Sequence, residues 1–138
     1  MLLKGVKVIE HATYYAAPGA GGILSDWGAE VIKIEPPGGD PVRPNFPTKG
    51  TGNDHLTYNP AFDGDNRVKK SIFVDTRTEE GREVVRKLAD TADVFLTNFL
   101  PDARQKLKID VEHIRAINPQ IIYARGSAHG DKGPERTV

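Results

Sequence analysis

A run of small residues near the start of the chain is the first feature with chemical consequences. Residues 16–22 are Ala-Ala-Pro-Gly-Ala-Gly-Gly, and they follow an apolar segment, Val6–Glu10, that is typical of a buried strand. A glycine-rich turn between a strand and a helix exposes backbone N–H groups and the positive end of the helix, which together attract an anion. We therefore expect a tight turn over residues 16–22 beside an anionic ligand, with a short helix over Ile23–Trp27 that ends at Gly28.

The spacing of these glycines argues against one kind of nucleotide site. The dinucleotide pattern G-x-G-x-x-G would require a third glycine at position 24, and Leu24 stands there instead. Glu35, at the end of the next apolar segment, would suit a ribose contact. An NAD-dependent dehydrogenase is therefore disfavoured but stays open as an alternative.

The polar residues that most often carry chemistry show no complete catalytic or metal-binding pattern. The chain has no cysteine, which excludes disulfides and thiolate chemistry, and its histidines and acids lack the spacing of a metal site. Ser25 and Ser127 lack the surroundings of a nucleophile elbow. His11 ends a strand and His129 lies in a glycine-rich loop, so each either touches a ligand or fills a structural role. His55 and His113 are expected at the surface.

The aromatic and basic residues allow two interpretations each. Tyr14 and Tyr15 follow the first strand and either cover the core or contact a ligand. We expect Trp27 in the core, between helix and sheet. The basic run Arg67–Lys70 is either a solvated edge or a phosphate contact.

Length and composition place the chain among ordinary single domains. It has 138 residues, and its 19 Lys and Arg balance its 19 Asp and Glu, which argues against a nucleic-acid-binding surface. No apolar run is long enough for a membrane span, and the start of the chain lacks the apolar stretch of a signal peptide. A cytoplasmic protein is expected.

The remaining elements alternate between strands and helices. We expect a long irregular loop over Pro36–Lys69 and a helix that begins with a capping box, Thr76 to Glu79, and runs to Ala89. Pro101 is expected to open a short helix, and Asp110 to cap a helix over Val111–Ile117. The further strands are expected at Glu30–Glu35, Ser71–Asp75, Val94–Leu96 and Gln120–Arg125.

These elements predict an α/β fold with an open, doubly wound, Rossmann-like and mostly parallel sheet. Several strands are continuously apolar, as expected when helices cover both faces. A glycine-rich tail, Gly126–Val138, follows the last strand at the edge where such sheets bind ligands. Because the chain stops there, we expect it to be a fragment of a larger domain.

Several short segments, in order along the chain, resemble one enzyme family. The chain is similar to the N-terminal part of family III CoA-transferases, which include formyl-CoA and carnitine-CoA transferases and are related to the 2-methylacyl-CoA racemases. The matching segments cover nearly the whole chain, and no single one is diagnostic. They are Leu3–Glu10, Ala17-Pro18, Trp27–Glu35, Pro37, Gly39-Asp40, Asn66–Ser71, Val74-Asp75, Glu80-Gly81, Ala92–Val94, Asn98-Phe99, Asn118-Pro119, Ile122-Tyr123 and Gly130–Pro134.

The resemblance implies a domain organisation and a reaction. Residues 1–138 would be the N-terminal part of a CoA-binding large domain, without the rest of that domain or the small domain. The family transfers CoA from an acyl-CoA thioester to a carboxylic acid, through an aspartyl anhydride and then an aspartyl thioester, and needs no metal. Its nucleophilic Asp would lie beyond Val138, so this chain holds no catalytic residue and is expected to be inactive alone. Full-length members form intertwined homodimers.

The resemblance also implies which residues would contact CoA. Thr13–Ala16 would lie along CoA, Asn98 and Phe99 would contact it, Val74 would lie beside the adenine, and Lys106 and Arg43 would approach phosphates. His129 would line the acyl site. The expected CoA-binding residues are Thr13, Tyr14, Tyr15, Ala16, Arg43, Val74, Asn98, Phe99 and Lys106.

The chain also departs from the family pattern, and other functions stay open. Thr97 and Leu100 flank the Asn-Phe pair where the family often has Glu and Arg or Gly, Pro36 replaces an Arg, and His129 replaces an aromatic residue. The acyl group and the acceptor acid are therefore not defined. A racemase fragment and a non-catalytic nucleotide- or CoA-binding module are the alternatives.

Overall fold

Five parallel strands form one sheet in the order β3-β2-β1-β4-β5 in a computed structural model that describes residues 1–43, 59–130 and 132–135. This order and the parallel pairing confirm the predicted doubly wound α/β fold. The strands are β1 (Lys7–His11), β2 (Glu30–Glu35), β3 (Lys70–Phe73), β4 (Val94–Thr97) and β5 (Ile122–Arg125).

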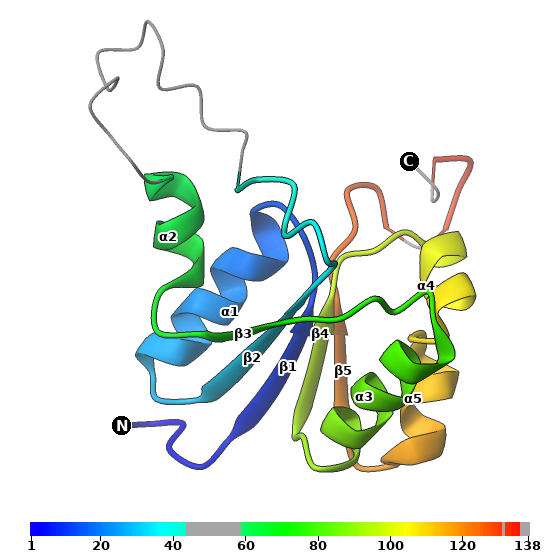
Figure 1. The fold of residues 1–138 in the computed structure, drawn as a ribbon, viewed down its shortest axis with the longest axis horizontal. Helices are drawn as coiled ribbons and strands as arrows, with labels where there is room; N and C mark the ends of the chain where they lie inside the picture. Colours follow the sequence, from blue (N-terminus) through cyan, green and yellow to red (C-terminus); the bar gives the residue numbers. More distant parts are fainter. Residues whose placement is uncertain (44–58, 131, 136–138) are drawn as a thin grey trace, which may run out of the picture.

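Helices cover both faces of this sheet. Figure 1 shows α1 and α2 on one side and α3, α4 and α5 on the other. The helices are α1 (Ala16–Asp26), α2 (Pro60–Asn66), α3 (Glu79–Asp90), α4 (Pro101–Leu107) and α5 (Val111–Ile117).

None of the helices in the described part of the chain is long and apolar enough to cross a bilayer.

Two apolar clusters, one on each face, hold the layers together. Val8 and Leu96 belong to the cluster under α1, whereas Ile9 and Phe95 belong to the cluster under α3 and α5. Neighbouring residues of one strand point to opposite faces, so a strand covered on both sides is buried along its whole length. The central strand β1 shows this, since all its residues but Lys7 are buried.

Helix α1 begins at Ala16, so the predicted tight turn over residues 16–22 is wrong. The glycines lie inside the helix and face the protein. A methyl group on Gly21 would lie 1.9 Å from Glu10 Oε2, and one on Gly22 would lie 2.8 Å from the Asp65 carbonyl oxygen. These glycines let α1 pack closely on β1 and α2, so they do not form an exposed phosphate-binding turn.

The same small residues explain why Trp27 is not in the core. The buried face of α1 is made of Ala17, Pro18, Gly21, Gly22 and Ser25, so the helix lies close to the sheet without a large side chain. Trp27 caps the end of α1 and is 51% exposed. The prediction of a buried Trp27 is wrong.

The predicted irregular loop over Pro36–Lys69 contains a helix. Asn59 caps α2, because its side chain accepts a hydrogen bond from Phe62 N at 3.0 Å, and Pro60 opens the first turn. An Asn-Pro pair is a known start signal of this kind. His55, whose exposure the sequence predicts, lies outside the described residues.

Three other helix starts test the capping predictions. α4 begins at Pro101 and Asp110 caps α5, as predicted. The capping box from Thr76 to Glu79 is wrong, because Thr78 is the cap of α3 and accepts from Gly81 N at 3.0 Å. Thr76 is instead buried just after β3.

Candidate functional site

Strands β1 and β4 are neighbours whose following helices leave to opposite faces of the sheet. β1 leads into α1 and β4 leads into α4, with His11 paired in register with Thr97 at the carboxyl ends. In open parallel sheets this switch point is where ligands bind. The two loops that leave it are Ala12–Tyr15 and Asn98–Leu100, and together they form the candidate site (Figure 1).

One side chain joins these two loops. Asn98 Oδ1 accepts a hydrogen bond from Thr13 N at 3.0 Å, and Asn98 Nδ2 donates to Thr13 O at 2.7 Å. The amide thus pairs with both backbone groups of a residue 85 positions away. The structure brings two predicted site residues together, and the side chain of Asn98 holds the site in shape.

Two aromatic rings, those of His11 and Phe99, meet at the switch point. His11 is buried at the end of β1, and its ring meets the Phe99 ring edge-to-face with 4.9 Å between centroids. Burial, assisted by the nearby Lys33 charge, lowers the pKa of His11 to about 4. The imidazole is therefore neutral at pH 7, and its Nδ1 has no hydrogen-bond partner among the described residues. These observations favour the packing role for His11.

The turn after β1 presents two tyrosine rings to solvent. Tyr14 and Tyr15 are 53% and 54% exposed, and Ala16 beside them is also exposed. Tyr14 has a φ of 63°, a left-handed conformation that costs a residue with a Cβ about 1 kcal/mol. Contacts from the rest of the protein must hold it there.

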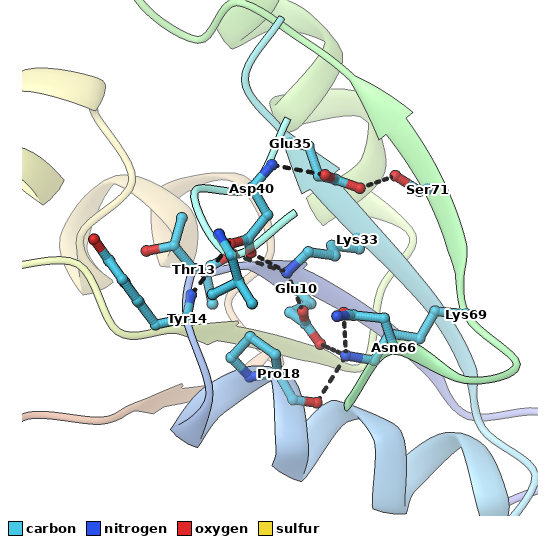
Figure 2. Close-up of polar contacts among 12 residues, drawn as sticks. Glu10, Thr13, Tyr14, Pro18, Lys33, Glu35, Asp40, Asn66, Lys69 and Ser71 are labelled. Carbon is cyan, nitrogen blue, oxygen red and sulfur yellow. Dashed lines mark hydrogen bonds and ion pairs between the residues drawn. The ribbon is translucent and has the colours of Figure 1, made fainter. Parts of the chain in front are cut away.

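A group of buried charges lies directly beneath this turn. We call Glu10, Lys33, Asp40 and Lys69 the buried charge cluster (Figure 2). Lys33 Nζ donates to Glu10 Oε1 at 3.0 Å and to the Ala12 carbonyl oxygen at 3.1 Å. The same ammonium forms an ion pair with Asp40 Oδ2 at 2.9 Å. Every one of these side chains is at most 1% exposed.

Lys69 closes the cluster on the α1 side. Its ammonium forms an ion pair with Glu10, with 2.7 Å between Nζ and Oε2. It also donates hydrogen bonds to Pro18 O at 2.7 Å and to Asn66 Oδ1 at 3.0 Å. Burial lowers the pKa of Lys69, and the Glu10 carboxylate opposes that shift. The cluster contains two carboxylates and two ammonium groups, so its formal charges cancel.

A second ion pair holds the loop that carries Asp40. Glu35 receives two hydrogen bonds from Arg43, at 2.6 and 2.7 Å, one from Asp40 N at 2.9 Å, and one from Ser71. Burial alone would raise the pKa of Glu35, but the hydrogen bonds from Arg43, Ser71 and Asp40 N lower it to about 2. The Arg43 guanidinium also stacks over the Phe62 ring at 4.0 Å. Arg43, a predicted phosphate contact, is thus already paired with Glu35.

The other predicted residues lie farther along the sheet. Val74 follows β3, donates its N–H to Glu35 O at 2.8 Å, and packs on the core. Lys106 is exposed on α4, and His129 is exposed beyond β5, with Nδ1 3.6 Å from Glu135 Oε2. Of the predicted residues, Thr13, Tyr14, Tyr15 and Ala16 lie in the turn after β1, and Asn98 and Phe99 lie in the loop after β4.

The basic run before β3 is used within the protein. Arg67 pairs with Asp26 and Lys70 with Glu30, both at the surface. These pairs support the solvated-edge interpretation for Arg67 and Lys70, whereas Lys69 belongs to the buried charge cluster.

Sequence reasoning missed the buried polar groups. Glu10 and Lys33 are charged residues that lie between or beside apolar residues of two predicted strands, and they pair in register. Two opposite charges inside strands expected to be buried are the signal that could have found them. Arg104 was also missed as a supporting residue. It is 5% exposed, and its Nη1 donates to the Phe99 carbonyl oxygen at 2.6 Å, so it fixes the loop after β4.

The remaining features of the described residues bear on metal binding and on surface hollows. No group of three His, Asp or Glu residues within 1–43, 59–130 and 132–135 could hold a metal ion. A surface hollow lies at the opposite, amino edge of β4 and β5. It is lined by Asp90, Thr91, Ala92, Asp93, Asn118, Gln120 and Ile122.

Comparison with known proteins identifies the family. Residues 3–138 match the pattern of CoA-transferase family III. The chain is 38% identical, over 99% of its length, to cinnamoyl-CoA:phenyllactate CoA-transferase of Clostridium sporogenes. It is 41% identical, over 97% of its length, to (R)-2-hydroxy-4-methylpentanoate CoA-transferase of Clostridioides difficile. In both cases it spans 33% of the relative, so it corresponds to about a third of these enzymes.

A solved structure agrees with the sequence comparison. The crystal structure of a CAIB/BAIF family protein from Brucella suis superposes with a TM-score of 0.87 at 41% identity, over 97% of this chain and 35% of that one. The family pattern, the relatives and this structure all cover nearly the whole chain. The chain belongs to CoA-transferase family III.

Proposed function

We propose that this chain is the CoA-binding part of an enzyme that moves CoA from an acyl-CoA thioester to an acceptor carboxylic acid. The observation that carries the proposal is the switch point, where Asn98 ties the loop after β4 to the turn that exposes Tyr14 and Tyr15. The two CoA-transferases of Clostridium sporogenes and Clostridioides difficile align with the chain over this same part.

The charges of the site suit a polyanionic carrier with a thin arm. The N-cap of α1 has no side-chain hydrogen bond, and its first turn has no acidic residue, so the positive end of this helix is left for a ligand. Lys106 is exposed on α4 and suits a CoA phosphate. Arg43 would have to share its guanidinium with Glu35 to bind one.

The reaction requires a carboxylate that we place in polypeptide outside this chain. An Asp carboxylate would attack the thioester carbonyl, form a mixed anhydride and expel CoA as a thiolate. The thiolate would then attack the aspartyl carbonyl, which gives an enzyme thioester and releases the donor acid. The acceptor carboxylate would attack this thioester and expel the thiolate, which finally takes the acceptor acyl group and frees the Asp. The 138-residue chain alone should show no turnover.

Other features of the complete protein remain proposals. An intertwined homodimer and a cytoplasmic location are proposed from the resemblance and from the sequence. A 2-methylacyl-CoA racemase is the nearest alternative, because the residues that would separate the two reactions lie outside the chain. A non-catalytic CoA-binding module is the other alternative.

Calorimetric titration of the chain with CoA tests the proposal. Tyr14→Ala should weaken binding about tenfold by removing a ring from the site. Trp27→Ala is the matched control, because that ring is 51% exposed at the far end of α1 and should not affect binding. A folded sample that shows no saturable binding of CoA would refute the proposal.

A further inference from the structure

The turn after β1 is held at three successive residues by contacts from three directions. Lys33 Nζ donates to the Ala12 carbonyl oxygen at 3.1 Å. Asn98 bonds both backbone groups of Thr13. Asp40 Oδ1 accepts from Tyr14 N at 3.4 Å. Figure 2 shows that Thr13 and Tyr14 lie next to Asp40 and Lys33.

Lys33 connects these contacts to the rest of the protein. Its ammonium has three N–H groups, and three oxygens lie within 3.1 Å of it, on Glu10, Ala12 and Asp40. It therefore joins strand β1, the turn that follows β1, and the loop that follows β2. Few side chains besides lysine could reach all three sites from within a buried strand.

The requirements of folding alone do not explain four buried charges. Removing charges from water is costly, and buried ion pairs can often be replaced by apolar side chains of similar volume without loss of stability. Apolar residues at these positions could fill the space between α1 and β2. They could not hold the Ala12 carbonyl or the Tyr14 N–H, because both need a polar partner.

We propose that the buried charge cluster is a positioning device for the CoA site, in which Lys33 and Asp40 fix the turn Ala12–Tyr14 before the ligand arrives. This inference rests on the proposed function. A turn ordered in advance spares the ligand the cost of ordering it. The cluster holds Tyr14 in its left-handed conformation, and the exposed ring of Tyr14 is therefore positioned beside the site before the ligand binds.

Two variants separate positioning from simple stability. Lys33→Met leaves Asp40 without its ammonium partner and should destabilise the fold. Lys33→Met combined with Asp40→Asn removes one charge of each sign, and the asparagine keeps the oxygen that faces the N–H groups of Tyr14 and Val42. The double variant should regain most of the stability lost in Lys33→Met. The Ala12 carbonyl oxygen would still lack its hydrogen bond from Lys33.

We expect CoA affinity to fall about tenfold in both variants, with faster amide hydrogen exchange at Thr13 and Tyr14. Val85→Ala, in the core on the α3 side, is the control for a general loss of stability, and it should leave CoA affinity unchanged. The proposal is overturned if affinity and amide protection in the double variant return to the wild-type values along with stability. Absence of CoA binding by the wild type would refute the proposed function, and the exchange rates would still decide whether the cluster holds the turn.

Discussion

Gly21→Ala tests the close packing of α1 against the buried charge cluster. In an ordinary helix interior this substitution stabilises a protein by about 1 kcal/mol, because alanine loses less backbone entropy than glycine. Here the new methyl group would lie 1.9 Å from Glu10 Oε2 and 3.1 Å from Lys69 Nζ. The Glu10 side chain or the helix must therefore move.

The magnitude follows from the contacts that would be lost. Glu10 is fully buried, and Lys69 Nζ lies 2.7 Å from the same oxygen. Breaking a buried ion pair costs about 3–5 kcal/mol. After the helix-propensity gain of about 1 kcal/mol, we expect a net loss of about 2–4 kcal/mol.

Urea denaturation followed by circular dichroism measures this loss. Gly19→Ala in the same helix is the matched control, since its methyl group would meet Asp65 Oδ1 at 3.4 Å, an ordinary contact. It should be neutral or stabilising by up to about 1 kcal/mol. If Gly21→Ala is as stable as the wild type, the packing of α1 on Glu10 is not as described.

Three further variants test single contacts. Asn98→Ala leaves the Thr13 backbone groups unpaired and should lower the free energy of unfolding by about 2 kcal/mol in urea. In the wild type, the pKa of His11 is about 4 in the folded state and 6.5 in the unfolded state. The free energy of unfolding should therefore fall by about 3 kcal/mol as the pH drops from 6.5 to about 4, because the unfolded state binds the proton first. His11→Phe should remove that fall. The wild type should also lose stability as the pH drops from 4.5 to about 2, because Arg43 keeps the Glu35 carboxylate ionised in the folded state only. Glu35→Gln should remove this second pH dependence. Wild-type stability that is constant across either pH window would contradict the corresponding assignment.

The fold class could be predicted because its signals are local. Continuously apolar strands that alternate with capped helices are visible within short windows, and Pro101 and Asp110 start their helices as expected. Helix α1 was mispredicted because glycine has a low helix propensity and the buried face has few large apolar residues. Tertiary packing, here against Glu10 and Asp65, overrides that propensity.

The site was predictable in part. The resemblance selected Thr13 and Asn98, but their mutual hydrogen bonds join residues 85 positions apart and depend on the pairing of β1 with β4. Glu10 and Lys33 carry a local signal, since both are charged residues in apolar strands. Lys69 carries none, because it enters the cluster from the segment between α2 and β3.

The most direct test of the account is to locate the CoA site by NMR. Titration of the ¹⁵N-labelled chain with CoA should give saturable shifts that are largest at residues 13–16 and at Asn98 and Phe99, where β1 and β4 end. The account is contradicted if a folded sample shows no saturable change. It is equally contradicted if the largest shifts fall at Asp90 and Asn118, in the hollow at the opposite edge of the sheet.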